Sequence, residues 1–87
     1  MNGSTVVEVL AAVTTVCAFL PQAVKILKTK NVKDLSTAMW VLQVIGFALW
    51  VTYGITTKNW PIIVPNAITF LFSCGILGLK LSPSTQG

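Results

Sequence analysis

The most constraining feature of this sequence is a pair of long hydrophobic stretches, 37–57 and 61–79, that contain no charged side chain. A third stretch, 5–27, is similarly apolar and carries one charge near each end, Glu8 and Lys25. A helix needs about 20 mostly apolar residues to cross the hydrocarbon core of a bilayer, and all three stretches are long enough. Helices are the expected form for unbroken spans in lipid, because every backbone polar group must be paired there. The sequence therefore predicts an all-α membrane protein with three transmembrane helices.

Composition agrees with a membrane protein and argues against several other classes. Of the 87 residues, 54% are hydrophobic and 9% are charged, whereas a soluble domain is about one-quarter charged. The absence of His and the presence of only two carboxylic side chains disfavour an enzyme, and we expect neither a cofactor nor a metal. A nucleic-acid partner is not expected, because no basic stripe follows one element. Cys17 and Cys74 lie within the hydrophobic stretches and are predicted to be small packing residues.

The connections predict one domain over residues 1–81, followed by a tail, 82–87, with the composition of a disordered end. Only Lys58 and Asn59 separate the second and third stretches, so these two helices should be antiparallel neighbours. The first stretch is not expected to be a cleaved signal peptide, because it lacks a basic start and ends in Pro-Gln rather than in small residues.

Lysine placement predicts the orientation in the membrane. Five lysines flank the first link or follow the third stretch: Lys25, Lys28, Lys30, Lys33 and Lys80. The opposite side has Lys58 alone. By the positive-inside rule, the first link and the C-terminus should face the cytoplasm and the N-terminus should lie outside.

Each hydrophobic stretch carries polar or aromatic side chains at steps of three, four or seven, which keep them on one helix face. These rows are Thr14, Thr15 and Gln22; Ser36, Gln43, Gly46, Trp50, Tyr53 and Thr57; and Asn66, Thr69 and Ser73. Helix packing is the expected role of Gly46, Thr69 and Ser73. Gln43, Asn66 and Trp50 are harder to explain in this way, because a carboxamide in hydrocarbon is costly and Trp prefers the interface.

Three of these residues are predicted to meet at one depth in the outer half of the membrane. Asn66, Trp50 and Thr15 lie about 8, 10 and 15 Å from the outer ends of their helices. An indole offers a flat apolar face, and an amide offers both a donor and an acceptor. With no charge expected at this depth, the group suits a neutral, polyhydroxylated ligand, although other neutral polar solutes would fit as well.

Proline positions and helix number bear on mechanism. Pro21 lies within the first helix and withdraws a hydrogen bond from the Cys17 carbonyl, which gives either a static kink or a hinge. Met39 on the cytoplasmic side and Tyr53 on the outer side bracket the expected pocket, as alternating access requires. Because three helices cannot enclose a path for a solute, we expect a homodimer of six helices with its two-fold axis along the membrane normal.

Four motifs resemble a known family. The segment 19–22 (FLPQ) is similar to the signature of PQ-loop proteins. Together with 35–39 (LSTAM), 49–54 (LWVTYG) and 61–66 (PIIVPN), it resembles the bacterial SemiSWEET sugar transporters, half-sized relatives of SWEETs. The resemblance covers roughly residues 6–80.

The resemblance implies a parallel homodimer of triple-helix bundles with spatial order one-three-two, in the bacterial plasma (inner) membrane. It also implies facilitated sugar transport by alternating access. The residues that it assigns are a pocket of Trp50 and Asn66, a hinge of Pro21 and Gln22, an inner gate of Met39 and Phe19, and the outer-gate tyrosine, Tyr53. Thr57 and Asn59 stand where relatives often place Arg and Asp, so closure of this outer gate would depend on neutral hydrogen bonds.

The predicted function is therefore uniport of a mono- or disaccharide that binds Trp50, Asn66 and Thr15. Coupling to protons is not expected, because ion-coupled carriers usually bury an ionisable group and Glu8 lies near the outer edge. Two alternatives stay open: a transporter of another small neutral or amino-acid-like solute, and a membrane assembly subunit that transports nothing.

Overall fold

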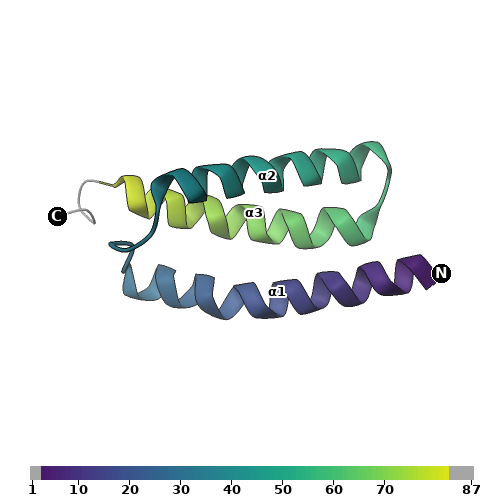
Figure 1. Cartoon of the computed structure of the whole chain (residues 1–87), viewed down its shortest axis with the longest axis horizontal. Helices are drawn as coiled ribbons and strands as arrows, with labels where there is room; N and C mark the ends of the chain where they lie inside the picture. Colours follow the sequence, from purple (N-terminus) through teal and green to yellow (C-terminus); the bar gives the residue numbers. More distant parts are fainter. Residues whose placement is uncertain (1–2, 83–87) are drawn as a thin grey trace.

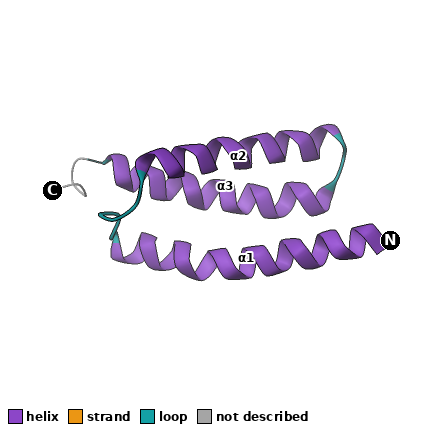
Figure 2. Cartoon of the chain, viewed as in Figure 1, coloured by secondary structure: helices purple, strands orange, loops and turns teal. Residues whose placement is uncertain are grey.

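The structure, a computed structural model, describes residues 3–82 and consists there of three helices and no strand (Figures 1 and 2). They are α1 (Gly3–Thr29), α2 (Thr37–Thr56) and α3 (Trp60–Leu81). These bounds differ from the expected ranges by one or two residues at the ends, as helix termini commonly do. Each helix is long and apolar enough to cross a membrane, so the chain is a multi-pass membrane protein. Of the predicted disordered tail, 82–87, the residues from 83 onward lie outside the described part of the chain.

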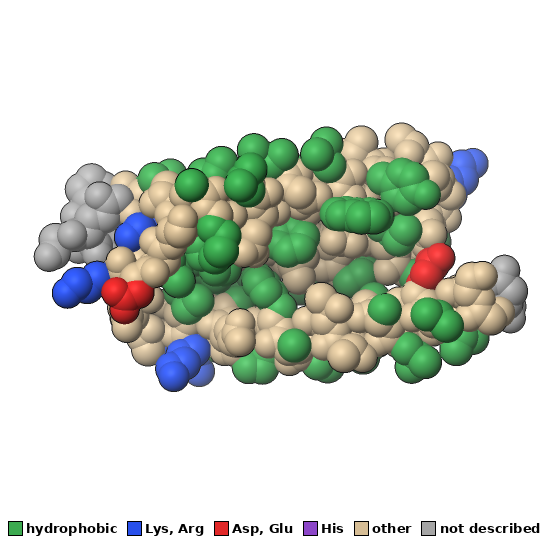
Figure 3. All heavy atoms as spheres, viewed as in Figure 1, with side chains coloured by type: hydrophobic (Ala, Val, Ile, Leu, Met, Phe, Trp, Pro, Cys, Tyr) green, Lys and Arg blue, Asp and Glu red, His purple; other side chains and the backbone are tan. Residues whose placement is uncertain are grey.

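Helix α3 lies between α1 and α2, so the spatial order is one-three-two (Figure 1). Among the described residues, no Cα atom of α1 comes within 8 Å of a Cα atom of α2. One end of the bundle holds the start of α1 and the turn between α2 and α3, and we call it the turn end. The other end holds the link 30–36 and the end of α3, and we call it the link end. Charged side chains gather at these two ends (Figure 3).

Local sequence explains where the helices begin and end. The Ser36 hydroxyl accepts a hydrogen bond from the Met39 amide at 3.2 Å, which caps the start of α2. Lys58 has a positive φ of 53°, and the following amide, of Asn59, donates to the Gly54 carbonyl at 2.8 Å. This left-handed turn stops α2 and reverses the chain. Pro61 lies in the first turn of α3, where a missing amide hydrogen costs nothing.

Packing is concentrated at the link end. Ala23, Trp40 and Ile76 come from three different helices and are 1%, 6% and 0% exposed. Six partly buried side chains pack against them: Phe19, Ile26, Leu27, Leu35, Phe72 and Leu77. Elsewhere large apolar side chains are exposed on the protein surface, as a surface that faces lipid allows.

The two cysteines are not paired in the structure. Cys17 and Cys74 are both free thiols and both exposed on the surface of the protomer. Cys17 lines a depression with Trp60, Val64 and Ile68 of α3. Their role as small packing residues stays a prediction.

Candidate functional site

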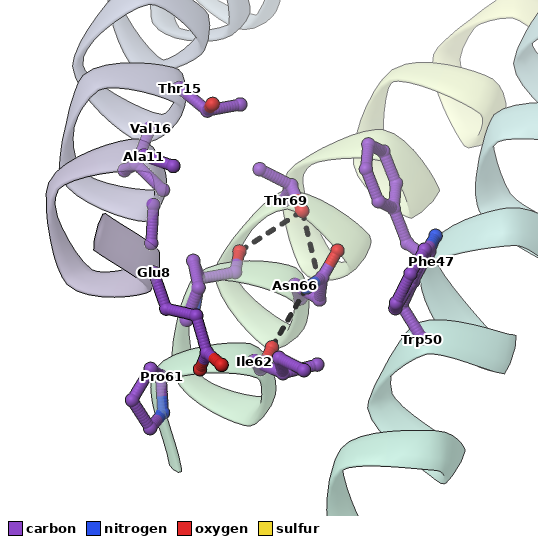
Figure 4. A pocket seen from close by; sticks show the side chains of 12 residues that line it. Glu8, Ala11, Thr15, Val16, Phe47, Trp50, Pro61, Ile62, Asn66 and Thr69 are labelled. Atoms are coloured by element: carbon purple, nitrogen blue, oxygen red, sulfur yellow. Dashed lines mark hydrogen bonds between the residues drawn. The ribbon is translucent and has the colours of Figure 1, made fainter. Parts of the chain in front are cut away.

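A cavity of about 290 Å³ lies among the three helices toward the turn end. Ligand pockets in proteins span about 300–1,000 Å³, so this volume suits a small solute. Its lining consists of Glu8, Ala11, Ala12, Thr15, Val16, Phe47, Trp50, Pro61, Ile62, Pro65, Asn66 and Thr69 (Figure 4). Trp50, Asn66 and Thr15, which the sequence placed at a common depth on three helices, thus border one space.

Helix α1 contributes one continuous face to this cavity. Glu8, Ala11, Thr15 and their neighbours recur at steps of three and four, which align side chains along a helix. Thr14 lies off this face, and its hydroxyl donates to the Leu10 carbonyl at 2.8 Å. The cavity is open here because the alanines are small.

Glu8 corrects one expectation of the sequence analysis. The pocket was expected to contain no charge, but the structure places the Glu8 side chain in its lining (Figure 4). The signal was present in the sequence, because Glu8 precedes Thr15 by two helical turns and therefore shares its face. Nearness to the end of the hydrophobic stretch was the wrong criterion, since the cavity extends to that end, where Pro61 and Ile62 also line it.

Helix α3 supplies the polar groups of the cavity. The Asn66 amide nitrogen Nδ2 donates to the Ile62 carbonyl at 2.8 Å, which fixes the side chain against its own helix. The Asn66 oxygen Oδ1 accepts no hydrogen bond within residues 3–82 and is available to a ligand. The buried Thr69 hydroxyl, in contrast, lies 3.0 Å from the Pro65 carbonyl and 3.1 Å from the Asn66 carbonyl. The side-chain oxygen of Asn66 is therefore the hydrogen-bond acceptor on α3 that is free to bind a ligand.

Helix α2 supplies the aromatic wall. Trp50 is 53% exposed and packs edge-on against Tyr53, with ring centroids 5.8 Å apart and planes at 90°. Phe47 lines the cavity one turn nearer the link end and meets Phe19 of α1 edge-on, with centroids 6.3 Å apart. The sequence analysis missed Phe47, which has no polar atom and is distinguished only by its position one turn from Trp50. The Phe19–Phe47 contact separates the cavity from the packed link end.

The expected hinge and inner-gate residues lie outside the cavity. Helix α1 continues without a break through Pro21, and Gln22 is exposed. Met39 is 47% exposed in the first turn of α2. Phe19, besides its contact with Phe47, packs against the link-end core.

The expected outer-gate residues gather at the turn end and do not line the cavity of a single protomer. The Thr57 hydroxyl donates to the Tyr53 carbonyl at 2.8 Å, within its own helix turn. Asn59 precedes α3, and its side chain makes no capping hydrogen bond. Tyr53 and Asn59 are therefore freer than Thr57 to contact another molecule.

Comparisons with known proteins agree with this architecture. A family model described as "PQ loop repeat" matches residues 3–63. The chain is 44% identical over 71 residues to the "Sugar transporter SemiSWEET" of Bradyrhizobium diazoefficiens, which covers 82% of this chain and 83% of that protein. It is 38% identical over 77 residues to the protein of the same name from Leptospira biflexa, covering 88% of this chain and 91% of that one.

Two solved structures share the fold. A crystal structure of SemiSWEET in the inward-open conformation superimposes with a TM-score of 0.86 at 27% identity, over 93% of this chain and 87% of that one. A crystal structure of a bacterial homologue of SWEET transporters gives a TM-score of 0.76 at 35% identity, over 92% of this chain and 96% of that one. Sequence, fold and helix order agree, and the chain belongs to the PQ-loop family, within its SemiSWEET group.

Proposed function

We propose that this protein carries out facilitated transport (uniport) of a mono- or disaccharide by alternating access in a parallel homodimer. The observation that carries the proposal is the cavity in which the Trp50 indole and the unpaired Asn66 oxygen border the same space. A sugar presents C–H groups to an aromatic face and hydroxyls to a free acceptor. Relatives that match most of the chain are named sugar transporters.

Exposure at the rim of the cavity supports the dimer. Thr69 on α3 is buried, whereas Thr15 on α1 and Trp50 on α2 are exposed. One protomer therefore leaves its cavity open on the side between α1 and α2. A second copy, related by a two-fold axis along the membrane normal, would cover this opening and supply a second Trp50 and Asn66.

In the proposed cycle, Pro21 and Gln22 act as the hinge of α1, and Met39 and Phe19 form the inner gate. Tyr53 and Asn59 meet their partners' copies at the outer gate. Thr57 contributes less to this gate, because its hydroxyl hydrogen is already donated to the Tyr53 carbonyl.

The proposed location is the bacterial plasma membrane. Of the six lysines, only Lys58 lies at the turn end. The link end, with the other five, would face the cytoplasm, and the N-terminus would lie outside. Modification of single cysteines placed near each end, with a reagent that does not cross membranes, tests this orientation in intact cells.

Counterflow of labelled sugar into vesicles that contain only the purified protein tests the function. We expect wild-type protein to exchange sugar, and Trp50→Ala and Asn66→Ala each to abolish exchange while the dimer persists. Trp60→Ala is the matched control, because this tryptophan is 69% exposed and lies outside the cavity. Wild-type exchange in both pocket variants would remove the proposed site.

Other outcomes of the same assay decide between the alternatives. A panel of neutral solutes and amino acids separates a sugar carrier from a carrier of another small solute. Lack of exchange with every solute would favour an assembly subunit. Uphill accumulation of sugar driven by an imposed proton gradient would contradict uniport.

A further inference from the structure

Glu8 is the one acidic side chain that lines the cavity, and the proposed sugar site gives it no role. It is partly buried, and its carboxylate has no hydrogen bond or ion pair with any residue in 3–82. An unpaired carboxylate in such a setting is costly, unless water or a ligand supplies donors. The cavity therefore contains a strong acceptor whose partner must come from outside the described protomer.

No cation of the described chain neutralises this carboxylate. Lys58 is the only lysine at the turn end, and it lines a separate depression with Ile55, Trp60 and Ile63. The other five lysines lie at the link end. Within residues 3–82, no positive charge therefore cancels that of Glu8 at the cavity.

The start of α3 explains how a carboxylate is accommodated here. Pro61 and Ile62, in the first turn of α3, line the cavity beside Glu8 (Figure 4). The positive end of a helix dipole favours a negative charge at this position. The amides of Ile62 and Ile63 nevertheless point to the Asn59 carbonyl, each at 3.1 Å, so neither is bonded to Glu8. The dipole of α3 therefore favours the negative charge of Glu8, and both carboxylate oxygens stay free to accept hydrogen bonds from a ligand.

The remaining lining suits a ligand that is both hydroxylated and positively charged. Glu8 lies about 10 Å from Thr15 along α1, nearer the turn end. A carboxylate binds an ammonium group through charge-assisted hydrogen bonds, and the face of an indole attracts a cation. Trp50 supplies that indole across the same cavity. Asn66 remains available for hydroxyls.

Building on the proposed transport function, we propose that Glu8 makes the site select its substrate by charge. The site binds an amino sugar, whose ammonium group pairs with Glu8, in preference to a sugar acid of the same size. In the proposed dimer two Glu8 carboxylates face one path, so their fields add and attract cations to this path.

The test compares glucosamine with glucuronate as competitors of labelled glucose counterflow, at about pH 6.5, where an amino group is mostly protonated. Glucose counterflow by itself tests the proposed function. We expect glucosamine to compete at least about tenfold better than glucuronate, the effect of one hydrogen bond to a charged group. In Glu8→Gln this ratio should fall to within about twofold. Asp34→Asn, which removes the other acidic side chain, on the exposed link, should keep the wild-type ratio.

A second readout does not require transport. A bound ligand raises the melting temperature of the purified protein, so glucosamine should stabilise wild type more than glucuronate does, and Glu8→Gln should lose this difference. Equal effects of the two sugars on wild type, or an unchanged ratio in Glu8→Gln, would overturn the inference. Glucose counterflow without discrimination by charge would overturn it while leaving the proposed function intact.

Discussion

The two ends of the bundle are built from the same three helices but differ in what lies between them. At the link end, Trp40 and Ile76 fill the space beside Ala23, whereas at the turn end the helices border a cavity of about 290 Å³. Helix α3 contacts both α1 and α2. The two ends differ in the side chains that lie between α3 and α1. On α1, the large Phe19 faces the packed end and the small Ala11 and Ala12 face the cavity. The bundle is therefore divided into a packed half at the link end and a half with a cavity at the turn end.

The largest effect that this comparison predicts is on stability, for a truncation at the packed end. Trp40 is 6% exposed and belongs to the core to which all three helices contribute a side chain. Replacing it with Ala leaves a cavity and removes many contacts, so Trp40→Ala should lower the free energy of unfolding by about 3–5 kcal/mol. Thermal unfolding of the purified protein in detergent measures this loss.

Trp50→Ala is the matched control at the other end. This indole is 53% exposed and borders empty space, so the same truncation should change stability by less than about 1 kcal/mol. Equal destabilisation by the two variants would contradict the division of the bundle into two halves.

A smaller loss is expected where Gly54 of α2 packs against the start of α3. A Cβ atom built on Gly54 would lie 2.7 Å from Ile63 Cγ1 and 3.2 Å from the Ile63 backbone nitrogen. Gly54→Ala must push the two helices apart, and overpacking of this kind costs about 1–3 kcal/mol. A Cβ atom on Gly78 would meet no atom within 4 Å, so Gly78→Ala should be close to neutral in the same unfolding measurement. If Gly54→Ala is also neutral, α2 can move relative to α3 at little cost.

Sequence reasoning predicted the helices and part of the site for physical reasons. Long uncharged stretches have few alternatives to transmembrane helices. Trp50 and Asn66 were identifiable because an indole and an amide at that depth conflict with a surrounding of lipid. Their position beside one cavity follows from the depth of each along its helix.

The sequence did not reveal which helix faces are buried or that Glu8 lines the cavity. In an apolar helix, the face toward lipid and the face toward another helix have similar hydrophobicity. Trp40 at the core and Trp60 on the surface are therefore indistinguishable by composition. Glu8 was misjudged because its closeness to the helix end was weighed above its alignment with Thr15.

At the start of α2, at the link end, we expect an effect of about 1 kcal/mol on the free energy of unfolding. The Ser36 hydroxyl accepts a hydrogen bond from the Met39 amide, and Ser36→Ala leaves that amide without its cap. The melting temperature should fall accordingly, and Ser36→Asn should recover most of it because Asn is an equally good cap. If Ser36→Asn is as unstable as Ser36→Ala, the hydroxyl acts through some contact other than capping.

The smallest effect, and the one of opposite sign, is expected for two hydroxyls one helical turn apart on α3. Ser73, toward the link end, is 0% exposed, and its Oγ has no hydrogen-bond partner in the described residues. Thr69, at the cavity, is 3% exposed and donates to backbone carbonyls of its own helix. Because an unpaired buried hydroxyl is unfavourable, Ser73→Ala should leave stability unchanged or raise it by up to about 1 kcal/mol. Thr69→Val, which removes a satisfied hydroxyl, should lower stability by about 1 kcal/mol. Unfolding curves of both variants measure the difference, and a loss of stability in Ser73→Ala would contradict the view that its unpaired hydroxyl is unfavourable.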